Sequence, residues 1–317
     1  MRSFSLRLLS LALLGLFSLG ASCNNGQESA KRTGEPGAEG KSSAEGKPSA
    51  LAQGPADSTK PAKSSKVEKL DRVDTSALTE PERRTFFELV NDVLSPCGDP
   101  VSVAVCVAES RACGACVPSA RYLVRLVSDG YEKGELLELF GARFDPKKRV
   151  NIDTAAAPVR GAPMAKVSIV EFSDFECPHC GAAHPLLSRV LEEFNGKVNL
   201  VFKQYPLDGH KNAAPAARAA VAAQAQNKFW ELADLLFEHQ RELSPEKIRE
   251  LAKSAGLDMT KFDADLASPA TQERVERDKK DGAAVGVQGT PTLFINGHAY
   301  KEGLQGLNKY LKEELEL

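Results

Sequence analysis

The most informative part of this chain is the segment from Val167 to Cys180, whose sequence is VSIVEFSDFECPHC. Its first six residues are mostly apolar and partly β-branched, which predicts a strand over Val167–Phe172. The segment ends in Cys177-Pro178-His179-Cys180, where the strand pattern gives way to a helical one. A helix start offers unpaired N–H groups and the positive end of a dipole, and both favour a thiolate over a thiol. Pro178 suits the first helical turn and His179 can add positive charge, so the segment predicts a thiol–disulfide exchange site.

The residues around this segment alternate between strand and helix patterns. Val198–Phe202 and Thr292–Ile295 are short and apolar, which predicts two further strands. Asn296-Gly297 is a strong hairpin signal and predicts a fourth strand over His298–Tyr300. The predicted helical stretches are Gly181–Phe194, about 213–284, and Leu304–Leu315. The C-terminal half is therefore predicted to be a mixed α/β domain.

This order of strand, Cys-x-x-Cys, helix and strand, followed by a helical stretch, a hairpin and a helix, resembles the DsbA-like thiol:disulfide oxidoreductase family. The resemblance covers residues 157–317 and implies a thioredoxin-like α/β fold with an inserted helical subdomain at about 213–284. It also implies that Cys177 is the exposed nucleophile, that Cys180 is the buried resolving thiol, and that no cofactor is needed. A histidine between the cysteines, His179, stabilises the thiolate relative to the disulfide, which makes the disulfide a stronger oxidant.

A second match is the stretch Gly289-Thr290-Pro291-Thr292-Leu293-Phe294. Thioredoxin folds place a loop with a cis-proline against the active-site disulfide, and the resemblance assigns that place to Pro291. A cis bond turns the neighbouring backbone groups outward, where an extended substrate can pair with them. Thr290 is then positioned to touch the thiols. Threonine at this place is more typical of the isomerase-like branches, which leaves the direction of electron flow open.

A third match is Glu171, a carboxylate in an otherwise apolar strand. Burying it is costly unless it has a partner or a task. The family has an acid at this place, near the buried thiol, where it assists proton transfer; burial should raise its pKa. The alternative is that Glu171 points to solvent from a half-exposed strand. Pro185 also fits the family, which often has a proline in the active-site helix.

The first residues predict export. Arg2 and Arg7 precede an apolar run, Leu8–Leu19, which is shorter than the roughly 20 residues that span a bilayer, and 1–23 therefore reads as a secretory signal. Gly20-Ala21-Ser22-Cys23 resembles a bacterial lipobox, which implies that Cys23 is lipidated and becomes the mature N-terminus. The alternative is ordinary cleavage near an unpaired cysteine. Of 7 cysteines, six remain without Cys23, enough for three pairs in an oxidising compartment.

A low-complexity segment follows the predicted signal. It is rich in Gly, Ser, Ala, Pro, Lys and Glu, and has too few large apolar residues to offset its chain entropy. We expect a disordered linker over 24–76, which would let a catalytic domain work at a distance from a membrane while it stays tethered.

A small helical domain with four cysteines is predicted over 77–150. Thr79-Glu80-Pro81-Glu82 is typical of a helix start, and apolar residues then recur at helical spacing. A helical unit of this size has a marginal core and gains from cross-links. We therefore expect two structural disulfides, with the pairing open, among Cys97, Cys106, Cys113 and Cys116. The alternatives are a redox role for Cys113-Gly114-Ala115-Cys116, and zinc binding by the four thiols.

The sequence therefore predicts an exported thiol:disulfide oxidoreductase, most plainly an oxidase, in the bacterial periplasm or cell envelope. Its expected partners are reduced or misoxidised secreted polypeptides, a redox partner that recharges the site, and a membrane reached through the lipid on Cys23, with the inner and outer membrane both open. The net charge of −2 gives no argument for nucleic acid, and no metal site is predicted. One alternative is a reductase or isomerase of a maturation system such as cytochrome c biogenesis. Another is a non-enzymatic envelope lipoprotein that binds partners.

Overall fold

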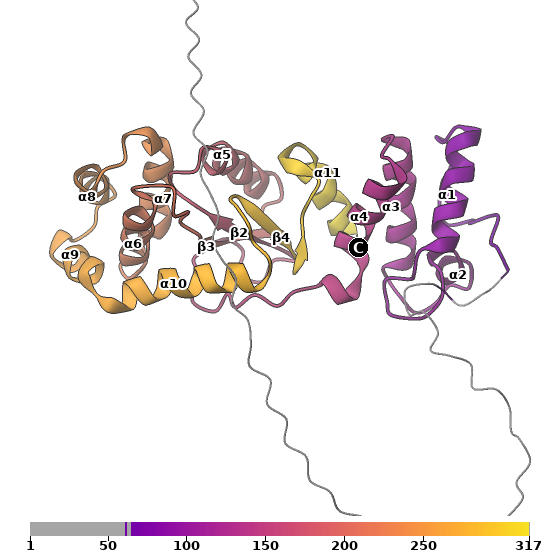
Figure 1. Cartoon of the computed structure of the whole chain (residues 1–317), viewed down its shortest axis with the longest axis horizontal. Coiled ribbons are helices and arrows are strands. Elements are labelled where there is room, and N and C mark those ends of the chain that lie inside the picture. Colours follow the sequence, from indigo (N-terminus) through magenta and orange to yellow (C-terminus); the bar gives the residue numbers. More distant parts are fainter. Residues whose placement is uncertain (1–60, 62–64, 317) are drawn as a thin grey trace, which may run out of the picture. The chain divides into compact units, whose positions relative to one another are not determined.

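A computed structural model of the chain describes residue 61 and residues 65–316 (Figure 1). The described residues belong to one compact unit. The predicted signal, the predicted lipidation site Cys23 and the linker up to residue 64, except residue 61, lie outside the described residues. Among the residues that are described, no helix has the length and apolar character needed to cross a membrane.

The N-terminal part of this unit is helical. Its helices are α1 (Glu80–Asp92), α2 (Val103–Ala108), α3 (Cys116–Ser128) and α4 (Lys133–Phe144), followed by a short 3-10 helix at Pro146–Lys148. Thr79 caps α1 in a capping box with Glu82, as the sequence signal at this position predicts. One apolar cluster holds the helices together, and its buried members include Phe86, Leu89 and Leu123.

The packed structure begins earlier than the expected end of the linker at residue 76. Leu70 and Val73 are buried in the same apolar cluster as the helices. The backbone of Val67 exchanges two 2.9 Å hydrogen bonds with the side-chain amide of Asn91 on α1. Apolar residues at every third position distinguish this stretch from the Gly- and Ser-rich segment before it, and their burial stabilises an ordered conformation.

A five-stranded sheet forms the centre of the C-terminal part. Its strands are β1 (Val159–Gly161), β2 (Val167–Ser173), β3 (Val198–Gln204), β4 (Thr292–Ile295) and β5 (His298–Ala299). Their spatial order is β1-β3-β2-β4-β5, in which β2 and β3 are parallel and the other pairs are antiparallel. The parallel pair is joined through α5 (Pro178–Glu193), which places the two cysteines at the carboxyl end of β2. Strand β1 was not predicted because it has only three residues and none of them is buried.

Helices cover both faces of the sheet. On one face, α5 and α11 (Gly303–Glu316) pack Leu187 and Leu311 against Ile169 (Figure 1). On the other face lies α10 (Pro269–Ala284), whose Gly282 is so close to the sheet that a Cβ there would lie 2.7 Å from the ring of Tyr205. The predicted thioredoxin-like α/β fold is confirmed by this arrangement.

The helical insertion between β3 and β4 is built from five helices. They are α6 (Ala213–Gln224), α7 (Phe229–Glu238), α8 (Pro245–Ser254), α9 (Met259–Ala267) and α10, with the 3-10 helix η2 (Gln240–Glu242) after α7. Residues in the left-handed backbone conformation separate some of these helices, among them Asn227 at φ 57° and Gly256 at φ 77°. The core of the insertion continues into Phe175, Cys177 and Cys180, so the inserted helices pack directly on the cysteine pair.

Candidate active site

The two cysteines lie at the start of α5. Cys177 is the N-cap of the helix, in an extended conformation, and Cys180 is in the first turn. Within the described residues both are free thiols. Cys180 is fully buried, and Cys177 is 4% exposed, which is less than expected for an exposed nucleophile. The Cys177 thiol is covered because it donates a 3.2 Å hydrogen bond to the carbonyl oxygen of Thr290.

Pro178 and His179 lie between the thiols and are both exposed. Pro178 occupies the first helical position, where its missing N–H costs no hydrogen bond. The exposed edge of the site is therefore made of these two residues, and a polypeptide that reaches Cys177 would pass over them.

The loop that contains Pro291 comes from the other side of the sheet. The Thr290–Pro291 peptide bond is cis, in agreement with the prediction from the sequence. Thr290 contacts the Cys177 thiol through its backbone carbonyl. The Thr292 hydroxyl donates a 2.7 Å hydrogen bond to the carbonyl of Gly289 and closes the loop before β4.

Glu171 is buried on the face of β2 that α5 covers. Its side chain is on the same face as Ile169, and the residue is 1% exposed, which excludes the alternative of a solvent-facing carboxylate. Neither carboxyl oxygen has a hydrogen-bond partner among the described residues. Burial raises the pKa of Glu171 to about 7, so this group can gain or lose a proton near neutral pH.

The acidity of the Cys180 thiol is perturbed as well. Burial raises the pKa of the Cys180 thiol to about 12, and the charge of the nearby Glu171 acts in the same direction. A thiol with this pKa needs a base before it can attack a disulfide. Glu171 is the titratable neighbour whose charge acts on the pKa of this thiol.

Two residues that support the active-site turn were not predicted. Asp174 is 1% exposed and accepts hydrogen bonds from the backbone N–H groups of Glu176 at 2.7 Å and Leu207 at 2.9 Å. Its Oδ2 also lies 2.7 Å from Nδ1 of His210, a residue for which the sequence indicates no partner. An aspartate often accepts a hydrogen bond from the backbone N–H two residues later, and Asp174 does so here. This local signal could have been found in the sequence.

Gln240 is the second such residue. Its side-chain amide donates 2.8 Å hydrogen bonds to the carbonyl oxygens of Phe175 and Cys177. A Cβ at position 181 would lie 2.5 Å from Oε1 of Gln240, so the close approach depends on Gly181. No local pattern connects η2 with the start of α5, which explains why the sequence does not reveal this contact.

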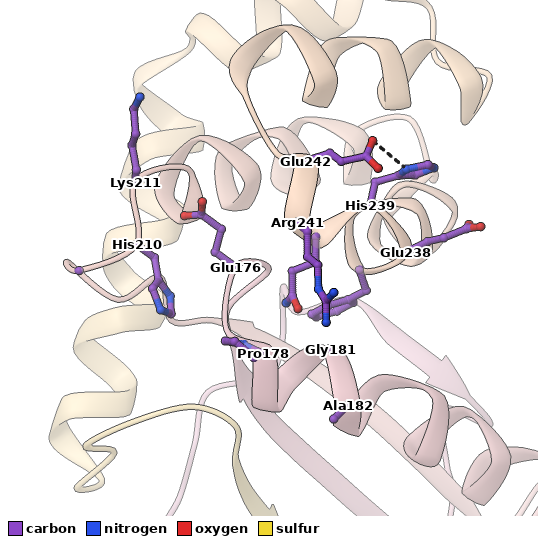
Figure 2. Close-up of a pocket in the computed structure, with 13 residues that line it drawn as sticks. Glu176, Pro178, Gly181, Ala182, His210, Lys211, Glu238, His239, Arg241 and Glu242 are labelled. Carbon is purple, nitrogen blue, oxygen red and sulfur yellow. Dashed lines mark ion pairs between the residues drawn. The ribbon is translucent and has the colours of Figure 1, made fainter. Parts of the chain in front are cut away.

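An open cavity of about 710 Å³ lies beside the cysteine turn. Figure 2 shows that it is lined by Pro178 and Gly181 on one side, by His210 and Lys211 on another, and by residues of and around η2 such as Arg241. Because Pro178 is part of its wall, the cavity adjoins the exposed edge of the site. Its lining carries charges of both signs, which suits a polar peptide segment.

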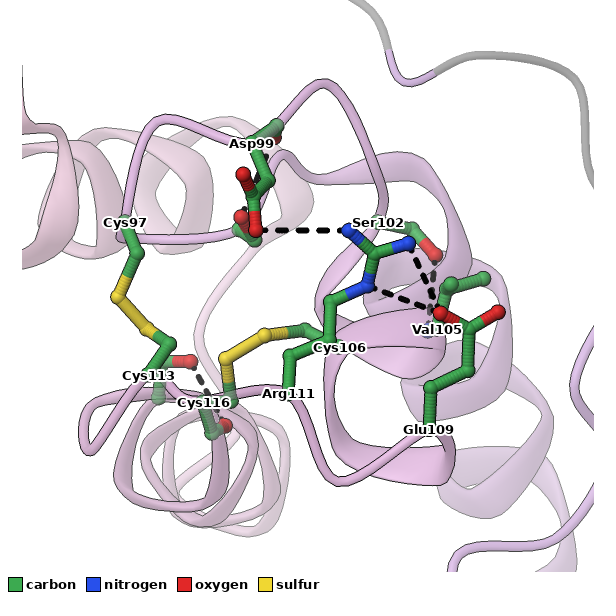
Figure 3. Close-up of a disulfide and its surroundings, with 11 residues drawn as sticks. Cys97, Asp99, Ser102, Val105, Cys106, Glu109, Arg111, Cys113 and Cys116 are labelled. Atoms are coloured by element: carbon green, nitrogen blue, oxygen red, sulfur yellow. Dashed lines mark hydrogen bonds and ion pairs between the residues drawn. A yellow bond between two sulfur atoms is a disulfide. The ribbon is translucent and has the colours of Figure 1, made fainter.

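The four cysteines of the helical part are paired in two disulfides. Cys97 is bonded to Cys113 and Cys106 to Cys116 (Figure 3). The sequence predicts disulfides here without their pairing. The second bond joins α2 to the first residue of α3.

Solved structures are similar to just over half of this chain. BdbD from Bacillus subtilis, in its oxidised form, is 25% identical, with a TM-score of 0.48 over 53% of this chain and 98% of its own. The thiol-disulfide exchange protein α-DsbA2 from Wolbachia pipientis is 24% identical, with a TM-score of 0.46 over 57% of this chain and 94% of its own.

Curated relatives match about half of this chain. The Na(+)/H(+) antiporter NhaA 3 of Salinispora tropica is 40% identical over 152 residues, which is 48% of this chain and 23% of the antiporter. NhaA 1 of Mycolicibacterium gilvum is 37% identical over 153 residues, or 47% of this chain and 25% of the antiporter. The match thus spans about a quarter of the length of these relatives.

A family model described as Thioredoxin matches residues 153–313, which is half of the chain. The match includes the strand with Glu171, the Cys177–Cys180 pair and the cis bond before Pro291. It supports thiol–disulfide oxidoreductase activity and the predicted likeness to DsbA, whose characteristic helical insertion is present here. This chain belongs to the thioredoxin family.

Proposed function

We propose that this protein is an exported oxidase that introduces disulfides into secreted or envelope polypeptides. The observation that supports this most directly is the position of the Cys177–Cys180 pair at the start of α5, with the Thr290 carbonyl 3.2 Å from the Cys177 thiol. In its oxidised form the pair would pass its disulfide to a substrate thiolate that reaches Cys177 beside this loop.

The reaction begins with the pair as a disulfide. A substrate thiolate attacks Sγ of Cys177, a mixed disulfide forms, and the bond to Cys180 breaks. Cys180 leaves as a thiolate, and because its pKa in this site is about 12, it takes up a proton at once. Glu171, whose pKa is about 7, is the buried group that supplies this proton and later regains one from solvent.

The second half of the reaction completes the transfer. A second substrate thiolate attacks the substrate sulfur of the mixed disulfide, which forms the substrate disulfide and releases Cys177 as a thiolate. Two electrons have then moved from the substrate to the Cys177–Cys180 pair. A redox partner must take them up before the next turnover, and no cofactor enters the reaction.

The substrate would bind in extended form along the Thr290–Pro291 loop and over Pro178 and His179. The backbone of the loop offers polar groups to an extended chain, and the adjoining cavity of about 710 Å³ accepts a polar side chain or turn. Export through the segment 1–23 and lipidation of Cys23 would place the enzyme at the cell envelope, where substrates of this kind are found.

The second candidate is a reductase or isomerase, in which electrons flow from the cysteine pair to a substrate disulfide. Thr290 precedes the cis-proline, as in the isomerase-like branches of the family that this chain resembles. Such an enzyme would serve a maturation system such as cytochrome c biogenesis. A non-enzymatic, partner-binding lipoprotein is the third candidate, and Cys177→Ser separates it from the other two, because a binding protein would lose no disulfide exchange.

The reduction potential of Cys177–Cys180 separates the two enzymatic candidates. We expect equilibration with glutathione to give a reduction potential near the oxidising end of the family, at about −120 mV, and not near the thioredoxin value of about −270 mV. The measurement uses the full chain with Cys97→Ser and Cys113→Ser, so that the exposed disulfide of the helical part does not contribute. A value close to that of thioredoxin would overturn the oxidase proposal in favour of the reductase.

A further inference from the structure

The two disulfides of the helical part lie side by side. The Sγ atoms of Cys97, Cys113 and Cys116 all lie within 4.8 Å of one another, so the bond Cys97–Cys113 is next to a sulfur of the bond Cys106–Cys116 (Figure 3). A thiolate formed at Cys113 would therefore have a second disulfide within reach after only a small movement.

The outer disulfide is accessible and the inner one is not. Cys97 is exposed and Cys113 half-buried, whereas Cys116 is 3% exposed and Cys106 fully buried. Gly98 and Gly114 follow the two outer cysteines, and no described atom lies within 4 Å of a Cβ built on either. The outer disulfide is thus open to a polypeptide thiol on the side of the exposed Cys97.

The loop that carries Cys97 is held by contacts other than its disulfide. Leu94 and Ser102 form an isolated β-bridge across its base, and the N–H of Ser95 donates a 2.9 Å hydrogen bond to the carbonyl of Val101. The guanidinium of Arg111 lies 3.5 Å from the Asp99 carboxylate, which ties the loop to the segment before Cys113. Opening the outer disulfide would leave Cys97 in place.

The arrangement favours transfer to the Cys113-x-x-Cys116 pair. Cys116 is the first residue of α3, and no described side chain caps the start of this helix. The N–H of Cys116 donates a 3.2 Å hydrogen bond to the carbonyl of Cys113, which closes the turn between these two cysteines. Cys116 is also the inner sulfur that lies near Cys113.

From these observations we propose that the four cysteines form a second thiol–disulfide exchange centre, a relay that oxidises a dithiol polypeptide independently of Cys177 and Cys180. A thiolate of the polypeptide attacks Sγ of Cys97, and Cys113 leaves as a thiolate. Cys113 then attacks Sγ of Cys116; the bond Cys113–Cys116 forms, the bond Cys106–Cys116 breaks, and Cys106 takes up a proton.

The last step releases the product. The second thiolate of the polypeptide attacks its own sulfur in the mixed disulfide, which forms the product disulfide and leaves Cys97 as a thiol. Two electrons and two protons have moved from the polypeptide to Cys97 and Cys106, and one disulfide, Cys113–Cys116, remains. This centre uses none of the groups around Cys177.

The test uses the full chain with Cys177→Ser and Cys180→Ser, which removes the candidate active site and keeps both disulfides. The protein is mixed with one equivalent of a reduced dithiol peptide, quenched with an alkylating reagent, and digested for mass spectrometry. The relay predicts equal labelling of Cys97 and Cys106, a Cys113–Cys116 disulfide in the digest, and an oxidised peptide. Labelling of Cys97 and Cys113 instead would overturn the relay, because it shows that the outer disulfide is merely reduced.

Two further outcomes count against the proposal. If no cysteine is labelled until the protein is denatured, the disulfides are structural only; if the isolated protein carries zinc on four thiols, there is no disulfide to exchange. A matched variant also has Cys106→Ser and Cys116→Ser, with its fold checked by circular dichroism. In this variant the labelled residues should become Cys97 and Cys113, because the transfer step has lost its acceptor.

Discussion

The side-chain amide of Gln240 lies 2.8 Å from the carbonyl oxygen of Cys177, although the two residues are 63 positions apart in the sequence. The same amide also reaches the carbonyl of Phe175. Through these two hydrogen bonds, the 3-10 helix after α7 holds the backbone at Cys177, the cysteine that we propose as the nucleophile. The insertion is therefore part of the machinery that positions the thiol.

Gln240→Ala should lower the rate of disulfide exchange with a peptide on the order of tenfold, because small displacements of a reacting group have large effects on rate. Stability should fall by about 1–2 kcal/mol as two hydrogen bonds are lost. Stopped-flow kinetics and chemical denaturation measure the two effects. Gln272→Ala, a substitution of an exposed glutamine on α10, is the matched control and should change neither.

Glu171→Gln should change how stability depends on pH. The pKa of Glu171 is raised from 4.5 to about 7, so between these values the folded protein holds a proton that the unfolded chain has lost. Stability must then fall as the pH rises through this window, by about 3 kcal/mol at about 1.4 kcal/mol per pKa unit. A glutamine cannot ionise, so its stability does not fall in this window. The free energy of unfolding of Glu171→Gln relative to the parent protein should therefore show no pH-dependent gain at pH 4 and a gain of about 3 kcal/mol at pH 8.

Denaturation curves at several pH values measure this difference. Parallel curves for the two proteins across the whole range would contradict the assignment of a buried, neutral carboxyl to Glu171. The same substitution should slow the exchange step that protonates Cys180, without preventing formation of the mixed disulfide.

Cys180→Ser should trap a covalent intermediate. With Cys177 alone, an attack on a substrate disulfide produces a mixed disulfide that no second thiol of the pair can resolve. Non-reducing electrophoresis of the variant after incubation with an oxidised peptide should show this adduct, and Cys177→Ser should show none. An adduct that persists in Cys177→Ser would place the reactive thiol elsewhere, with the helical part as the first place to look.

Asp174→Ala should be the most destabilising substitution near the site. Its buried carboxylate accepts hydrogen bonds from two backbone N–H groups and approaches His210, and removal leaves these donors unpaired. We expect a loss of about 2–4 kcal/mol in urea denaturation. His210→Ala leaves the two backbone bonds in place and should cost less than half as much; equal losses would mean that the histidine contact dominates.

The sequence predicts the sheet and the cysteine pair because their signals are local. Val167–Phe172 and Thr292–Ile295 are recognisable as strands from their own residues, and the cysteine tetrapeptide needs no distant partner. Helix α2 was not predicted, since Val103–Ala108 is uniformly apolar and shows no helical period.

Contacts between distant segments could not be predicted. The pairing of Cys97 with Cys113 depends on how a loop folds over the start of α3, and composition carries no information about that. The near burial of Cys177 has the same origin, because the carbonyl that covers it belongs to Thr290 on a loop beyond the whole insertion. Such features require the three-dimensional arrangement of elements whose individual sequences look ordinary.

The missing side chain at Gly181 has a consequence for protein engineering. The Gln240 amide can reach the carbonyls of Phe175 and Cys177 because no side chain projects from this position toward it. Anyone who transplants the inserted helices onto a simpler thioredoxin scaffold must therefore also transfer the glycine that follows the second cysteine. A larger residue there would displace the Gln240 amide, and the transplanted helices would lose its two hydrogen bonds to the cysteine turn.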